Sequence, residues 1–103
     1  MSNTETPVDP LEARRAEVAQ YDANIAMYNA IKATLPSEWP ANLAAHKGRQ
    51  DHQAAAAEVA AEDVELLAQL LFHDHCDRMA RTELLERTKA AAILAVLEAQ
   101  QNP

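Results

Sequence analysis

The sequence predicts an all-α fold, a small antiparallel helical bundle of three helices, or of four if the second helix is broken near Asp63. Two observations carry this prediction. The chain contains a single glycine, Gly48, and no proline between Pro40 and Pro103, so long stretches hold no residue that ends a helix. In the first half, apolar residues also recur at the three- and four-residue spacing of one helix face.

The composition bounds the core that these helices can form. The chain has 103 residues, of which 49% are hydrophobic, but many of these are alanines, and aromatic residues make up 4%. Burying one large apolar side chain stabilises a protein by roughly 1.5–3 kcal/mol, so the few large apolar positions must supply most of the stability. We expect one domain over residues 10–100, and oligomerisation would add to a small stability margin.

The charge, the apolar runs and the single cysteine indicate which partners and which compartment to expect. The formal net charge is −7, from 16 acidic and 9 basic residues spread along the chain, so we expect no nucleic-acid binding. The longest apolar run, Ala90 to Leu97, is too short to span a bilayer, and the polar start does not resemble a signal peptide. We therefore expect no contact with a membrane. Cys76 is the single cysteine and cannot form an internal disulfide, which fits a cytoplasmic protein.

The first nine residues are polar and are expected to form a flexible N-terminal arm. Asp9 then resembles a helix N-cap, and Pro10 suits the first helical position. From Pro10 to Leu35 two rows repeat every seven residues: Leu11, Val18, Ile25 and Lys32, and Arg14, Tyr21, Tyr28 and Leu35. Such a stripe is typical of a coiled-coil dimer and also of one helix in a compact bundle. We favour the bundle, because the second half of the chain offers a partner.

Pro36 is expected to end this helix, because it disfavours helical geometry at Leu35 and cannot continue the hydrogen-bond ladder. Residues 42–46 would form one or two turns, and Gly48 suits the left-handed conformation after them. Trp39 lies in this connection. We expect it to close the open end of the bundle, with an exposed anchor for a partner protein as the alternative.

Two breaks are expected after the glycine. Thr82 is a good N-cap, and a break there would give pieces close in length to the first helix. The Thr82 break is the one that we favour, so the predicted helices are 50–81 and 83–100, and a further break in the first of them near Asp63 is the alternative. Residues 101–103 are expected to fray.

The supply of large apolar residues suggests a function. From Leu66 to Phe72 and from Ile93 to Leu97 it exceeds what three short helices can hide. We therefore expect a non-catalytic interaction module, a helical adaptor, assembly factor or inhibitor that docks an apolar helix face onto a protein partner or onto a second copy. Small bacterial and phage accessory proteins often have this composition. The residues expected to contact the partner are Trp39, Leu66, Leu70, Phe72, Ile93, Val96 and Leu97.

A second hypothesis is a metal-binding or metal-sensing module. His73, Cys76 and Asp77 are ligand types for zinc, and residues three or four apart share one face of a helix. Two converging ligands do not complete a site, so His46 or His52 would have to join them. A polar helix end with Cys76 packed as a small apolar group is the interpretation that we favour, and no cofactor is expected.

Catalysis is not expected from this sequence. It contains no phosphate-binding loop, dinucleotide-binding fingerprint, nucleophile elbow or paired C-x-x-C motif. A glycine-poor helical chain with few loops is also a weak scaffold for a catalytic pocket. We therefore expect a protein that is not an enzyme.

Overall fold

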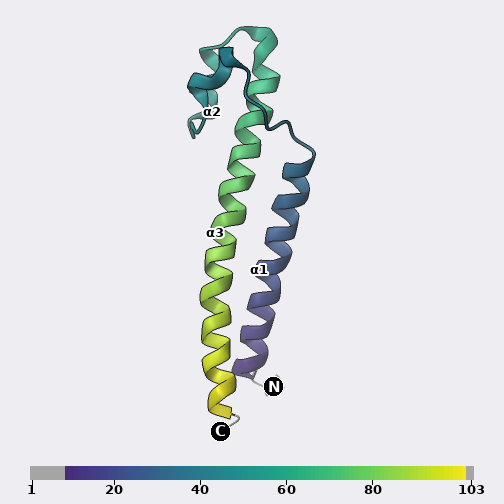
Figure 1. Cartoon of the computed structure of the whole chain (residues 1–103), viewed down its shortest axis with the longest axis vertical. Coiled ribbons are helices and arrows are strands. Elements are labelled where there is room, and N and C mark those ends of the chain that lie inside the picture. Colours follow the sequence, from purple (N-terminus) through teal and green to yellow (C-terminus); the bar gives the residue numbers. More distant parts are fainter. Residues whose placement is uncertain (1–8, 102–103) are drawn as a thin grey trace, which may run out of the picture.

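The computed structural model describes residues 9–101 as an antiparallel helical hairpin (Figure 1). Helix α1 spans Pro10–Ala33 and helix α3 spans Val64–Gln101. The connection holds three short elements, which are the 3₁₀ helix η1 at Ala41–His46, helix α2 at His52–Ala57 and the 3₁₀ helix η2 at Ala61–Asp63. The described residues contain no β-strand, so the all-α class is confirmed. The predicted arm and frayed end fall largely on residues 1–8 and 102–103, outside the described part.

Helix α1 begins where the sequence predicts and ends two residues early. The Leu11 N–H donates to Asp9 Oδ1 at 3.0 Å, so Asp9 is the N-cap of the helix. The last helical residue is Ala33 and not Leu35. Pro36 accounts for the end of the helix, because it restricts the backbone of the residue before it.

The predicted break at Thr82 is wrong, because α3 runs through this position as one helix of 38 residues. Thr82 Oγ1 donates to the Arg78 carbonyl oxygen at 3.0 Å, so the hydroxyl bonds within its own helix and does not cap a new one. Arg81 donates to Asp77 one turn earlier, which supports the helix at the same place. One long helix replaces the two that we predicted, and the described residues form a hairpin where we predicted three long helices.

The alternative of a break near Asp63 is the arrangement that the structure has. Helix α2 ends at Ala57, and α3 begins at Val64. The Asp63 carboxylate accepts a hydrogen bond from the Asn42 side chain at 3.2 Å, which ties the break to η1. Gly48 has a φ angle of 83°, the left-handed conformation predicted for it.

Helix α3 is longer than α1, and its excess length carries the connection. At 1.5 Å per residue, α3 extends about 57 Å and α1 about 36 Å. The start of α1 and the end of α3 lie together at the end opposite the connection, so α3 overhangs α1 at the other end (Figure 1). We call residues 36–65 the head and residues 10–35 with 66–101 the shaft. The head folds back onto the overhanging part of α3.

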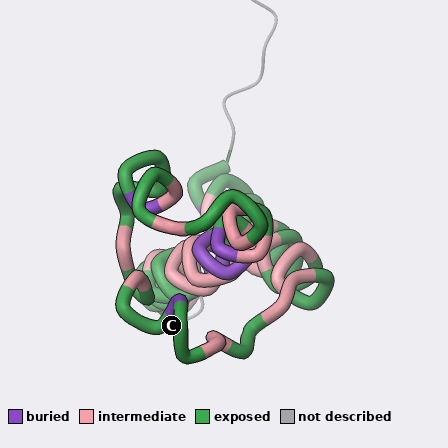
Figure 2. The backbone as a smooth tube through the Cα atoms, turned by 90° about the horizontal axis from the view of Figure 1, so that it is seen from above, coloured by how far each residue is buried: buried purple, intermediate pink, exposed green. Residues whose placement is uncertain are grey.

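The main buried cluster lies where the head meets α3 and not between the long helices. Its members are 0–1% exposed, and they are Leu43, Ala55, Leu67, Leu70 and Leu71. Figure 2 shows that fully buried residues are few and that exposed and intermediate residues make up most of the chain. The other buried residues of the described chain are Leu11, Cys76, Ala80 and Ala90. Three of these four are small, so the helix–helix seam buries little apolar area.

The overall dimensions reflect this open shape. The radius of gyration is 20.4 Å, whereas a compact chain of this length would have about 13 Å. A hairpin of two helices has no third layer to enclose its seam. The shaft therefore exposes apolar side chains that a closed bundle would hide.

Replacing Thr82 by alanine tests the continuity of α3. Alanine is the better helix former, so Thr82→Ala should leave the free energy of unfolding unchanged or raise it by about 0.5 kcal/mol. An N-cap would instead lose about 1 kcal/mol on the same substitution. Asp9→Ala removes a real N-cap and is the matched control, with an expected loss of about 1 kcal/mol in urea denaturation.

Replacing Leu70 by alanine tests the position of the core. Leu70 is 0% exposed, so Leu70→Ala should lower the free energy of unfolding by about 2–5 kcal/mol. Met27 is 48% exposed on α1. Met27→Ala should therefore change the free energy of unfolding by no more than about 0.5 kcal/mol. Equal losses in the two variants would contradict a core that is centred on the head.

Candidate functional site

Exposed apolar side chains cluster in the second half of α3. Leu84, Leu85 and Val96 are 54–58% exposed, and Ile93 is 43% exposed. Solvent-facing sides of helices usually carry polar residues, and leucine, isoleucine and valine are among the residue types most often buried. This end of α3 is therefore the first candidate for a surface that another molecule covers.

Helix geometry places three of these side chains on one side of α3. Each residue turns the helix by about 100°, so Leu85, Ile93 and Val96 project within about 80° of one another, with Ala92 beside them. We call these four residues the distal surface. Leu84 projects toward a different side, where it lines a groove with Ile25 of α1. Ile93 lies at the edge of the distal surface and lines a second groove with Tyr21 of α1.

The distal surface continues a side of α3 that the head covers at the opposite end. Leu67 precedes Leu85 by 18 residues, which is five complete turns, and Leu71 projects within about 40° of the same direction. Both residues are 0–1% exposed because they belong to the cluster that the head encloses. One side of α3 is thus covered near its start and exposed near its end.

Charge is distributed unevenly between the head and the shaft. The head contains six acidic and two basic residues, a net charge of −4. The shaft is longer, but its eight acidic and seven basic residues leave a net charge of −1. The distal surface therefore lies on a nearly neutral part of the molecule, and much of the acidity is concentrated at the other end.

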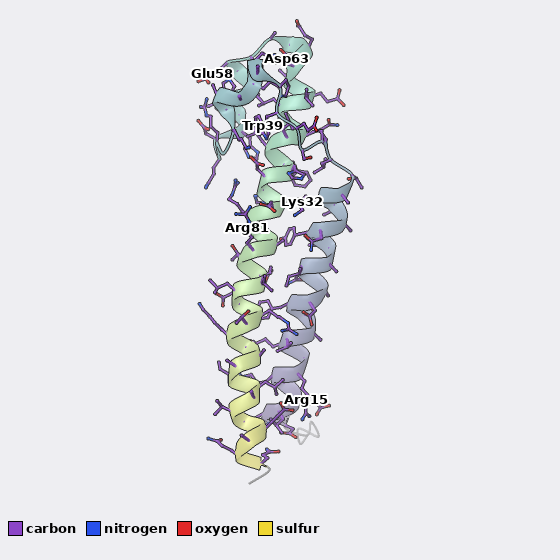
Figure 3. All side chains as sticks on the ribbon, in the orientation of Figure 1. Arg15, Lys32, Trp39, Glu58, Asp63 and Arg81 are labelled. Carbon is purple, nitrogen blue, oxygen red and sulfur yellow. The ribbon has the colours of Figure 1, made fainter. Side chains whose placement is uncertain are left out.

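Three ion pairs join α1 to α3 across the seam. They are Arg15–Glu98 at 3.2 Å, Asp22–Arg87 at 2.9 Å and Lys32–Asp77 at 2.9 Å. In Figure 3, Arg15 lies near the start of α1 and the end of α3, whereas Lys32 lies near the other end of α1 and close to Arg81 of α3. The hydrogen bond from Lys32, reinforced by Arg81, holds the pKa of Asp77 below its ordinary value. These contacts pair six of the shaft charges along the seam between α1 and α3.

A separate charged cluster stabilises the fold of the head. The Arg49 guanidinium donates to the carboxylates of Asp51 and Glu58. The bond from Arg49 lowers the pKa of Asp51, and the two carboxylates raise the pKa of Arg49. His46 joins this cluster, with Nδ1 3.5 Å from the Glu58 carboxylate.

Four of the seven residues predicted to contact a partner lie along α3 beyond the head core. Ile93 and Val96 belong to the distal surface, and Leu97 is half-buried beside them. Phe72 is 43% exposed, and its ring stacks on His75 with centroids 6.1 Å apart. The structure brings Ile93 and Val96 together and separates Phe72 from them by about six turns of helix.

The other three predicted contact residues lie at the head. Leu70 is 0% exposed, so its side chain is not available to a partner. Leu66 and Trp39 are partly buried and pack against the same cluster. The position of Trp39 agrees with a role in closing the end of the fold.

Leu85 is an exposed apolar residue of the distal surface that the sequence prediction did not include. The signal was present in the spacing, because Leu85 precedes Ala92 by seven residues and Val96 by eleven, and all three share one side of a continuous helix. The expected break at Thr82 instead placed Leu85 in the first turn of a separate helix.

The arrangement gives no support to a metal site. The part of the chain that the structure describes contains no group of three or more histidine, cysteine or acidic side chains that could hold a metal ion. Cys76 is fully buried, and burial raises the pKa of its thiol. Asp77 is engaged by Lys32, and His46 is engaged in the head by Glu58.

The groove beside the seam is small for a ligand site. It has a volume of about 180 Å³ and is lined by Lys32, Asp77 and Arg81 together with apolar side chains. The second groove, which Ile93 lines, has a volume of about 190 Å³. Small-molecule pockets usually measure roughly 300–1,000 Å³. The distal surface is therefore the stronger candidate.

No protein-family model, curated protein or solved structure matches the chain. Among the helices of residues 9–101, none is both long and apolar enough to cross a membrane. Function is therefore inferred from the geometry and chemistry of the surface itself.

The Lys32–Asp77 pair predicts a loss of stability in acid. Because the pKa of Asp77 is lowered on folding, its contribution is fully present above the unfolded carboxyl value of about 3.9 and is lost as the pH falls through the lower folded value. Asp77→Asn should therefore cost about 1 kcal/mol or less at pH 7, and this difference from the wild type should shrink below about pH 4. Urea denaturation of the wild type and of the variant at several pH values measures the cost at pH 7 and its decrease in acid.

Asp22→Asn is the control for this prediction. Asp22 also pairs with a cation across the seam, but 55% of its side chain is exposed, compared with 27% for Asp77. Its substitution should therefore have the smaller effect at neutral pH. A cost of Asp77→Asn that persists unchanged in acid would show that the pair is not its source.

Proposed function

We propose that this protein is a non-catalytic interaction module, a helical adaptor, assembly factor or inhibitor that docks the distal surface of α3 onto a protein partner or onto a second copy of itself. The observation that carries the proposal is the exposure of Leu85, Ile93 and Val96 on one side of a single long helix. Recognition through a helix uses anchors of this kind, spaced along one face.

The expected affinity follows from the area that remains exposed. Each of the three side chains is already about half covered, so burying the remainder contributes about 1 kcal/mol per residue. A micromolar complex requires about −8 kcal/mol, and association also has an entropic cost. Neighbouring backbone and alanine contacts must supply the difference, so we expect a micromolar complex and not a nanomolar one.

The remainder of the fold supports this surface. The ion pairs at Arg15, Lys32 and Arg87 hold α1 against α3 from one end of the shaft to the other. Leu85 and Val96 project away from α1, whereas Ile93 lies at the edge of the seam, where it lines a groove with Tyr21 of α1. A binding surface on a rigid helix loses less conformational entropy on docking than one on a mobile loop.

A charge placed in the middle of the distal surface tests the proposal. Val96→Glu would bury an unpaired carboxylate in any complex that covers this surface, so it should reduce capture of the partner at least about tenfold. Tagged wild-type and variant proteins are used as baits in a lysate of the source organism with added untagged protein. Mass spectrometry then measures the stoichiometry of what each bait retains.

Met27→Glu is the matched control for this experiment. Met27 is 48% exposed and projects about 200° around α1 from Ile25, which faces the seam groove. The same charge at this position should leave capture unchanged. A Val96→Glu protein with normal helical circular dichroism that retains the same proteins in the same amounts as the wild type would refute the proposed surface.

A further inference from the structure

We infer that the distal surface is covered by the distal surface of a second copy, with the two α3 helices antiparallel. The inference rests on the proposed function and selects the second copy from the two kinds of partner named there. Three features of the molecule carry it, which are the spacing of the exposed residues, the distribution of charge and the position of the head.

The outward side of α3 repeats every seven residues near its end. Leu85, Ala92 and Ala99 form one row, and Lys89 and Val96 form the other, so alternate steps are four and three residues. All five are exposed, and four are apolar. This is the spacing of a coiled-coil seam, which is complemented by a second seam of the same kind, and every copy of the chain supplies one.

The shaft is nearly neutral, so two shafts can meet without strong electrostatic repulsion. The shaft has a net charge of −1, and Lys89, the charged residue of this seam, contacts Glu86 of its own helix at 3.2 Å. A strongly basic or acidic partner would meet little excess charge of opposite sign here. A second copy presents a surface that is nearly neutral like the first, so neither copy leaves a large charge uncompensated.

The position of the head determines the direction of the pair. The head packs on Leu67 and Leu71, which lie on the same side of α3 as the distal surface. In a parallel pair, both heads would need the same space between the two helices, and two regions of net charge −4 would meet. In an antiparallel pair centred near Ala92, the heads lie about 80 Å apart, many times the Debye length of about 8 Å.

The antiparallel pair also leaves room for each head. If the two Ala92 residues meet, Gln101 of the second copy reaches only the level of residue 83, about 18 Å from Leu71 along the axis. The overlap is then about 28 Å long, which buries less than the roughly 800 Å² per partner of a standard stable interface. We therefore expect a dimer with a dissociation constant of about 10–100 μM.

Sedimentation equilibrium from about 10 to 500 μM tests the dimer. The wild-type mass should rise from that of the 11.3 kDa chain toward twice that value. Leu85→Glu and Val96→Glu should each raise the dissociation constant at least about tenfold, and Met27→Glu should leave it within about twofold. A wild-type protein that stays monomeric throughout, or distal variants that dimerise as the wild type does, would overturn the inference.

Single added cysteines test the direction. Ala92→Cys lies near the proposed two-fold axis and should form a disulfide between copies under mild oxidation. Ala99→Cys should not, because the two sites would lie about 20 Å apart along an antiparallel pair. The wild type, whose Cys76 is fully buried, is the control and should not cross-link. Equal cross-linking at both positions indicates a parallel pair, and any pattern other than cross-linking at Ala92 alone overturns the arrangement.

The two sets of variants separate this inference from the proposed function. If the wild type is monomeric but Val96→Glu still abolishes capture of a different protein, the second-copy inference fails and the proposed function stands. If neither self-association nor capture depends on Val96, both fail.

Discussion

Helix α3 has 38 residues and α1 has 24, and this difference in length decides where the chain can form a core. Over the overhanging part of α3 the head supplies a second layer, and Leu67, Leu70 and Leu71 there are fully buried. Beyond the head, α1 is the single neighbour of α3 among the described elements, so one side of α3 has no cover. The exposed distal surface is a direct consequence of a long helix with a short partner.

Features of the fold that depend on local chemistry could be predicted from the sequence. Asp9 caps α1 with its own carboxylate, Pro36 restricts its neighbour, and Gly48 adopts a conformation that other residues rarely adopt. Thr82 differs, because its hydroxyl can cap a new helix or bond to a carbonyl oxygen of the existing one. The local sequence is compatible with both, so the continuity of α3 could not be decided from it.

The candidate site was predictable only in part, for a related reason. Ile93 and Val96 were identified from their apolar character, but Leu70 has the same character and is fully buried. Which of these residues stays exposed depends on how far the head extends along α3, and this is a property of tertiary packing. The grouping of Leu85 with Val96 likewise requires an unbroken helix between them.

The most direct test of this account is therefore the distance between Glu65 and Ala99, two exposed positions that each lie 17 residues from Thr82. Spin labels at these positions, in a Cys76→Ala background diluted with unlabelled protein, can be measured by double electron–electron resonance. A continuous α3 predicts a distance of about 50 Å. A helix that folds back at Thr82 would bring the two positions to about 10–15 Å, the spacing of adjacent packed helices, and would contradict the account.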